Sequence, residues 1–189
     1  MVEPPAPAPI AADPEPRNES LAGESQLLSK ALTALSEGQP NRALAALAIY
    51  QEKFPHGSMA YEAALAQVKA EMASNQVGRA LAALDRAMAM PGFEGLPRSS
   101  ELTLMRAELL AQSRRCAEAL PTFDRLAGST PGSSDFDSSL VERALYGRAS
   151  CLASEGDAAG SRASLHDYLR RFPSGRFAKE ARTALAGQE

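Results

Sequence analysis

Apolar side chains recur at intervals of three and four residues along most of the chain, which is the spacing of one buried face of an α-helix. Leu28, Leu32 and Leu35 show this interval in one segment. Ser139 and Glu142 have the spacing of a capping box, which supports a helix start near 138. The pattern predicts first helices near 24–37, 58–74, 99–113 and 138–155, second helices near 40–54, 77–90, 116–127 and 158–172, and a closing helix over 177–186. We therefore expect an all-α protein made of paired helices.

The helix pairs are copies of one another. Residues 37–57 align without a gap on residues 155–175, at an offset of 118 positions. Weaker copies of the second helix include Arg79 and Glu118, and each unit closes on a turn that contains proline. The identical positions of the two best copies are Glu37, Gly38, Ala45, Leu47, Tyr50, Phe54, Pro55 and Gly57, which recur as Glu155, Gly156, Ala163, Leu165, Tyr168, Phe172, Pro173 and Gly175. About four repeats follow, and the Tyr and Phe pairs are expected in equivalent packing sites.

The N-terminal segment has a different composition. Prolines such as Pro4, Pro5 and Pro7 alternate there with alanine and acids, and such a segment cannot bury a core. We expect residues 1–23 to be a disordered tail or tether, and residues 24–187 to form the repeat domain. A tether favours a membrane segment or signal ahead of this sequence, and the alternative is a tail without an anchor. Contact with a membrane would be made only through that absent segment.

Composition and charge argue against catalysis and against nucleic-acid binding. The chain is 44% hydrophobic and 5% aromatic, and its net charge of -3 provides no general basic field for phosphates. His56 and His166 are the only imidazoles and lie three repeats apart, and the sequence contains no phosphate loop or zinc spacing. The sequence therefore predicts no enzyme, no metal site and no cofactor.

A local basic cluster near the C-terminus is the exception to the acidic balance. Such a cluster can meet phosphate groups or an acidic partner, but it can also complement a helix dipole and keep the end of an array soluble. The sequence pattern favours the second interpretation. The cluster consists of Arg170, Arg171, Arg176, Lys179 and Arg182, with Glu180 as the acid among them.

Small residues and turn residues give the repeats a family resemblance. Ala31, Ala107 and Ala149 each lie seven positions before the turn of their repeat, and Gly38 and Gly156 occupy that turn in two repeats. Together with the closing proline, these positions resemble the packing signature of tetratricopeptide repeats. Asn75 and Arg114 stand at the turn position in the middle repeats, which departs from the pattern. The resemblance implies a right-handed superhelical array of about four repeats with a C-terminal capping helix, acting as a protein-binding scaffold.

The end of the last repeat resembles a narrower group. Tyr168 to Gly175, followed by Ala178 and Ala181, is similar to bacterial envelope members such as the periplasmic Tol-Pal coordinator and the outer-membrane assembly lipoproteins. The resemblance implies a scaffold in an envelope assembly or signalling complex, in the periplasm or associated with the envelope. Two alternatives remain open: a soluble cytoplasmic adaptor of the same fold, and a structural subunit that assembles with itself. The oligomeric state is not predicted.

The candidate partner-binding surface is the concave face of the array, which one stripe of each first helix lines. A mixed apolar and polar stripe fits an extended or helical peptide held by a few apolar anchors. The alternative is that some of its leucines belong to the core. The stripe consists of Leu28, Leu32, Glu62, Leu65, Lys69, Met72, Glu101, Leu104, Glu108, Gln112, Arg143, Tyr146 and Ser150.

The two cysteines lie in helices that should run antiparallel. Cys116 and Cys151 are 35 residues apart, and the midpoint between them falls in the connection near 128–138. Residues equally far from the centre of such a connection lie at the same height on the two helices, so a disulfide is possible in an oxidising compartment. Two small buried thiols are the alternative, and the sequence leaves the choice open.

Overall fold

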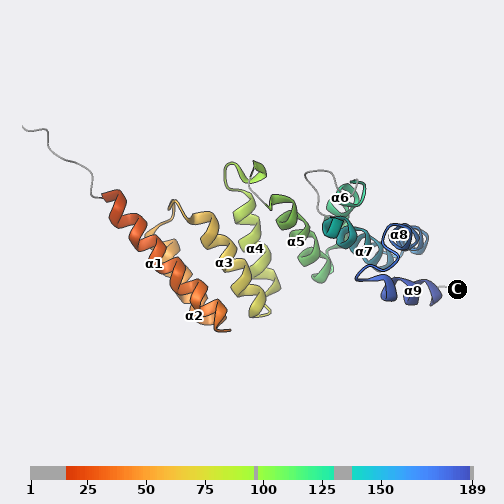
Figure 1. Ribbon diagram of the computed structural model, residues 1–189, viewed down its shortest axis with the longest axis horizontal. Coiled ribbons are helices and arrows are strands. Elements are labelled where there is room, and N and C mark those ends of the chain that lie inside the picture. Colours follow the sequence, from red (N-terminus) through yellow and green to blue (C-terminus); the bar gives the residue numbers. More distant parts are fainter. Residues whose placement is uncertain (1–15, 96–97, 130–137, 188–189) are drawn as a thin grey trace, which may run out of the picture.

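The computed structural model describes residues 16–95, 98–129 and 138–187, and the regular structure in these residues is helical throughout (Figure 1). This confirms the all-α repeat array. The elements are α1 (Pro16–Ser36), α2 (Pro40–Lys53), α3 (Ala60–Ala73), α4 (Val77–Met88), the short 3₁₀ helix η1 (Phe93–Gly95), α5 (Ser99–Gln112), α6 (Cys116–Ala127), α7 (Ser138–Ser154), α8 (Ala158–Arg171) and α9 (Ala178–Ala186).

Eight of these helices begin and end close to the predicted positions, and α1 does not. It begins at Pro16, eight residues before the boundary predicted at 24. The prediction treated every proline of the N-terminal segment as incompatible with a helix. Proline is well tolerated in the first turn, where its missing N–H would have no partner in any case. The expectation of disorder for residues 1–15 lies outside the described residues.

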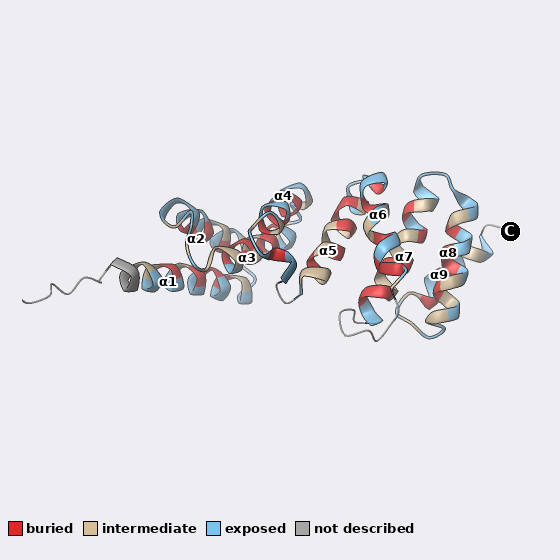
Figure 2. Cartoon of the chain, turned by 90° about the horizontal axis from the view of Figure 1, so that it is seen from above, coloured by how far each residue is buried: buried red, intermediate tan, exposed pale blue. Residues whose placement is uncertain are grey.

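The helices stack as antiparallel pairs in one elongated array. α1 and α9 lie at its opposite ends (Figure 1). Neighbouring first helices contact each other, α1 with α3 and α5 with α7, as on the inner side of a curved array. Buried residues occur in every helix from α1 to α9 (Figure 2), and they form one cluster around Leu47 and Tyr50 and a larger one that runs from Val68 to Ala181. The core is therefore divided along the array instead of being central.

A residue in the left-handed conformation ends each first helix. Gly38 has φ of 68° and Gly156 has φ of 86°, and the residues that depart from the family pattern adopt the same backbone, with φ of 56° at Asn75 and 58° at Arg114. Each N–H at this position bonds the carbonyl three residues earlier, as Arg114 does with Ala111 at 3.0 Å. The four turns are thus one helix-ending motif built with three residue types.

Replacing Arg114 by glycine is expected to raise the free energy of unfolding by about 1 kcal/mol. A side chain in the left-handed region costs about 1–2 kcal/mol, and the larger entropy of unfolded glycine offsets part of the gain. Urea unfolding measures the change. Asn75→Gly is the matched control and should gain less, because asparagine tolerates this conformation better than arginine. A loss of stability in Arg114→Gly would show that the arginine side chain makes a compensating contact.

Both ends of the array expose polar side chains. At the N-terminal end, α1 exposes Gln26, Ser29, Lys30 and Thr33, and Glu37 is exposed directly after it. At the C-terminal end, α9 buries Ala178 and Ala181 against the array and exposes Lys179, Glu180, Arg182 and Thr183. The outer face of the closing helix is therefore polar. Large exposed apolar side chains are found on α1, where Leu21 and Leu32 are 43% and 46% exposed.

Candidate partner-binding surface on the first helices

The predicted stripe follows the first helices α1, α3, α5 and α7, and most of it is accessible. Leu32 and Met72 are unusual among the large apolar residues, with 46% and 43% of their surface exposed. Glu62, Lys69, Gln112 and Ser150 are also exposed. The half-buried members are Leu65, Glu101, Glu108, Arg143 and Tyr146.

Two members of the predicted stripe belong to the core. Leu28 is 8% exposed and Leu104 is fully buried. Both occupy the same position in their repeats, where the side chain points between the first helix and its paired second helix. Leu65 and Tyr146 hold this position in the other two repeats and are half-buried. Leu28 and Leu104 therefore cannot serve as anchors for a partner.

A charged pair links the first helices of the last two repeats. Arg143 on α7 donates from Nε and a terminal nitrogen to the two carboxylate oxygens of Glu108 on α5, at 2.9 Å and 2.6 Å. These hydrogen bonds raise the pKa of Arg143 against the opposing effect of burial. Because the two charges neutralise each other, this bidentate ion pair adds no net charge to the surface.

Two stacked aromatic rings, which we call the aromatic wall, lie beside the Glu108–Arg143 pair: Tyr146 and Phe177. The ring of Tyr146 stacks on Phe177 with centroids 4.4 Å apart and planes 7° from parallel, and the guanidinium carbon of Arg176 lies 5.3 Å from the Phe177 centroid. The wall and the Glu108–Arg143 pair line one hollow of about 270 Å³, which also includes Gln112 and Ser150. The hollow thus joins α5, α7 and the start of α9.

A buried hydroxyl fixes the position of Phe177. The Tyr168 hydroxyl donates to Oε1 of Glu142 at 2.6 Å and accepts from the Phe177 N–H at 2.8 Å, while the Arg176 N–H donates to the same carboxylate oxygen at 2.5 Å. Burial and the bond to Glu142 raise the pKa of Tyr168 to about 12, so the hydroxyl stays protonated. Glu142, which the sequence suggests as part of a capping box, therefore connects α7, α8 and the start of α9.

The first repeat contains an equivalent contact between a glutamate and a tyrosine, 118 residues earlier, and we call both contacts Glu–Tyr clamps. Tyr50 donates to Oε2 of Glu24 at 2.7 Å, and the Met59 N–H donates to that oxygen at 3.0 Å. Burial acts to raise the pKa of Glu24, but the bonds from Met59, Tyr50 and other donors outweigh it and the pKa is lowered. Gly57 closes the clamp, since a Cβ there would lie 2.6 Å from the Tyr50 hydroxyl. The predicted equivalence of Tyr50 with Tyr168 and of Phe54 with Phe172 is confirmed, with ring separations of 5.7 Å and 5.8 Å.

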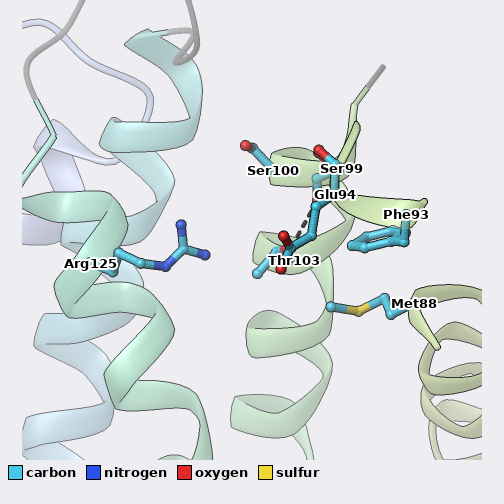
Figure 3. A pocket seen from close by; sticks show the side chains of 7 residues that line it. All are labelled: Met88, Phe93, Glu94, Ser99, Ser100, Thr103 and Arg125. Atoms are coloured by element: carbon cyan, nitrogen blue, oxygen red, sulfur yellow. Dashed lines mark hydrogen bonds between the residues drawn. The ribbon is translucent and has the colours of Figure 1, made fainter. Parts of the chain in front are cut away.

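A larger hollow lies away from the predicted stripe. Its volume is about 580 Å³, and Met88, Phe93, Glu94 and the start of α5 line one side while Arg125 of α6 faces them (Figure 3). The hydroxyls of Ser99 and Thr103 there donate to the backbone carbonyls of Glu94 and Ser99. Both hydroxyls are therefore engaged with the backbone and stabilise the local turn.

The structure joins Cys116 and Cys151 in a disulfide, with sulfur atoms 2.09 Å and Cα atoms 5.2 Å apart. Cys116 is the first residue of α6, and Cys151 lies in the last turn of α7. The bond ties the two helices together at the end opposite to their connection. Both residues are buried, with exposures of 4% and 0%.

Both histidines lie on the surface in the described part of the chain. His56 is exposed in the turn after α2, and His166 is exposed on α8. The described residues contain no group of three or more acidic, His or Cys side chains placed to hold a metal ion. Their helices are too short or too polar to cross a membrane.

Comparison with known proteins supports the repeat architecture. Residues 65–134 match the family model of the tetratricopeptide repeat, whereas no curated protein matches the chain. A tetratricopeptide repeat protein from Parabacteroides merdae ATCC 43184 superposes with a TM-score of 0.68 at 16% identity over 88% of this chain, which spans 60% of that protein. The MamA RS-1 ArsTM double mutant superposes with a TM-score of 0.63 at 13% identity, and the match covers 88% of this chain and 94% of that chain. MamA MSR-1 C2 superposes with a TM-score of 0.59 at 16% identity, and the match covers 90% of this chain and 84% of that chain. Residues 65–134 thus carry a tetratricopeptide repeat, and the described chain has the fold of tetratricopeptide-repeat proteins.

Proposed function

We propose that this protein is a non-catalytic scaffold that holds a partner protein on the surface formed by its first helices. Tetratricopeptide repeats generally mediate contacts between proteins. The observation that carries the proposal is the exposure of Leu32 and Met72 on this surface, at 46% and 43%. Exposed apolar side chains flanked by polar ones are typical of anchors for a peptide or helix.

The expected partner contact can be tested by changing these two anchors. The double variant Leu32→Ser, Met72→Ser should bind the native partner at least tenfold more weakly than the unchanged chain, since two apolar anchors lose their burial. The measurement is quantitative capture from native extract, followed by titration of the purified partner. The fold should persist, because neither side chain is part of the core.

Ile49 provides the matched control. It is a large apolar residue with 40% exposure, but it lies on the second helix α2. Ile49→Ser should capture the same partner as the unchanged chain. Equal capture by all three proteins would contradict the assignment of the surface. Failure of the unchanged chain to retain any protein specifically would contradict the scaffold function itself.

We further propose that the scaffold works in an oxidising compartment, as a tethered member of a bacterial envelope assembly or signalling complex. The Cys116–Cys151 disulfide supports this, because such bonds persist mainly outside the cytosol. The proline-rich segment ahead of α1 has the composition of a spacer. The test is fractionation of native cells with immediate blocking of free thiols. Blocked, disulfide-bonded protein in an envelope fraction is expected, whereas two free thiols in a cytosolic fraction would contradict the proposal.

A further inference from the structure

The C-terminal end of the array carries cations at positions where the earlier repeats carry mostly apolar side chains. Arg162 on α8 corresponds to Leu44, Leu81 and Leu120 of the preceding second helices, which contribute to the core. Arg182 on α9 corresponds to Leu27, Ala64 and Leu145 of three first helices, of which Ala64 and Leu145 are buried, and to Thr103 of the fourth. In the complete repeats, these positions pack against a neighbouring helix. Here both arginines are exposed.

Further basic side chains extend the same surface. Arg162, His166 and Arg170 are exposed at intervals of four residues along α8, so they form one stripe on that helix. Residues 158–187 contain six Arg and Lys residues against two acids, a local charge of +4 in a chain of net charge -3. This end of an otherwise acidic molecule is therefore cationic.

The solubility of an array end does not require this bias. The N-terminal end shows what a neutral cap looks like, because residues 20–53 contain three Arg and Lys residues against three acids. This first helix pair carries no net charge. The excess of cations at the opposite end therefore needs a separate explanation, and attraction of an acidic partner supplies one.

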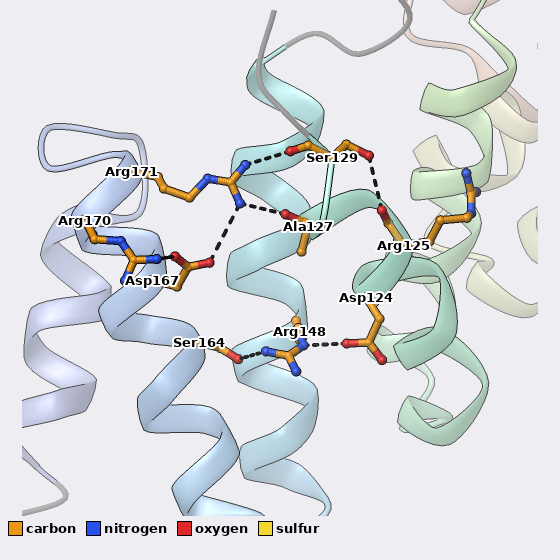
Figure 4. A network of polar contacts seen from close by, with 9 residues as sticks. All are labelled: Asp124, Arg125, Ala127, Ser129, Arg148, Ser164, Asp167, Arg170 and Arg171. Atoms are coloured by element: carbon orange, nitrogen blue, oxygen red, sulfur yellow. Dashed lines mark hydrogen bonds and ion pairs between the residues drawn. The ribbon is translucent and has the colours of Figure 1, made fainter. Parts of the chain in front are cut away.

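Some of the basic residues at this end already hold the array together (Figure 4). Arg171 donates to the carbonyl oxygens of Ala127 and Ser129 at the end of α6, at 2.7 Å and 2.8 Å. Asp167 pairs with Arg170 and lies 3.8 Å from Arg171. Arg162 and Lys179, by contrast, form no ion pair within the described residues. The array therefore leaves part of the charge of this surface uncompensated.

Neighbouring helices in this array are already joined by arginine and acid pairs. Arg148 on α7 donates to Asp124 on α6 at 2.5 Å and to Ser164 on α8 at 2.6 Å (Figure 4). Arg106 on α5 makes the equivalent contact with Asp85 on α4 at 2.5 Å. A helix placed against the cationic end could extend this arrangement if it supplied the acids. The Arg162 to Arg170 stripe spans about 12 Å of helix, which matches two turns of such a neighbour.

We propose that the C-terminal end, formed by Arg162, His166 and Arg170 of α8 and Lys179 and Arg182 of α9, binds an acidic helical segment of a partner protein. The segment lies beside α8 and α9, where a further second helix would continue the array. It presents acids at intervals of about four residues to the α8 stripe. This surface is separate from the one that carries Leu32 and Met72, so the scaffold has two docking sites of different chemistry.

The probe is a labelled, alanine-based helical peptide of about 20 residues with Glu at every fourth position, titrated against the full chain at low salt by fluorescence anisotropy. The unchanged chain should bind it, and a peptide with Gln in place of Glu should not bind. The triple variant Arg162→Ser, Lys179→Ser, Arg182→Ser should bind at least tenfold more weakly, since each exposed pair contributes up to about fivefold. Circular dichroism checks that the variant remains helical.

The matched control changes three exposed cations elsewhere: Lys30→Ser, Lys53→Ser, Arg79→Ser. It has the same net charge as the test variant and should bind the acidic peptide as the unchanged chain does. Equal weakening in both variants, or no weakening in either, would overturn the proposed location. Charge-dependent binding of anionic vesicles or of an oligonucleotide without binding of the acidic peptide would overturn the proposed partner class. The Leu32→Ser, Met72→Ser variant should still bind the acidic peptide. This result distinguishes the C-terminal site from the partner-binding surface proposed on the first helices.

Discussion

Reducing the disulfide between Cys116 and Cys151 is expected to lower the free energy of unfolding by about 4 kcal/mol. The bond closes a loop of 35 residues, and the chain-entropy model assigns a stabilisation of about this size to such a loop, because the cross-link restricts the unfolded chain. The effect should be large relative to the total stability of a small domain, which is about 5–15 kcal/mol. Urea unfolding with and without reductant measures it.

The double variant Cys116→Ala, Cys151→Ala is the control for this prediction. Its stability should equal that of the reduced chain to within the cost of the two lost sulfur atoms, and it should not respond to reductant. Because both cysteines are buried, reduction of the folded chain should be slow unless the helices separate. An unchanged unfolding midpoint on reduction of the unaltered chain, with thiol release confirmed, would show that the bond does not stabilise this fold.

Local periodicity predicted the paired helices, because each helix buries one face and each turn carries its own signal. The α6 bounds, Cys116–Ala127, agree with the prediction at both ends. The same reasoning failed at Pro16, where a residue that usually ends a helix occupies the first turn of one. Periodicity also cannot tell a leucine that packs on its paired helix from one that lines the surface. Leu28 and Leu32 lie on adjacent turns, yet their exposures are 8% and 46%.

The Glu–Tyr clamps were missed for a different reason. The acid precedes its tyrosine by 26 residues, so no local pattern relates them. The offset of 118 does relate Glu24 to Glu142, and extending the alignment upstream of residue 37 would have shown the match. The middle repeats have Tyr61 and Ser100 at the acid position, and Ala87 and Leu126 at the tyrosine position. The clamp therefore distinguishes the first and last repeats from those between them.

Truncating Tyr168 to alanine is expected to lower the free energy of unfolding by about 4 kcal/mol. The side chain is fully buried, and its ring lies within 6.4 Å of the rings of Tyr146, Phe172 and Phe177. Loss of a buried aromatic ring costs about 3–5 kcal/mol through lost burial and the cavity that remains. The change should also free the start of α9, so that Phe177 no longer stacks on Tyr146. Urea unfolding measures the loss of stability, and hydrogen exchange at Phe177 measures the release.

Tyr168→Phe separates the hydroxyl from the ring. It should cost about 1–3 kcal/mol, because the Phe177 N–H loses its acceptor and Glu142 loses a donor in a buried place. Tyr61→Phe is the matched control, since the Tyr61 hydroxyl is buried and has no hydrogen-bond partner among the described residues. Removing that hydroxyl leaves no other group unsatisfied and should be neutral or slightly stabilising. Equal effects of the two Tyr→Phe changes would mean that the Glu142 clamp adds nothing beyond the packing of the ring.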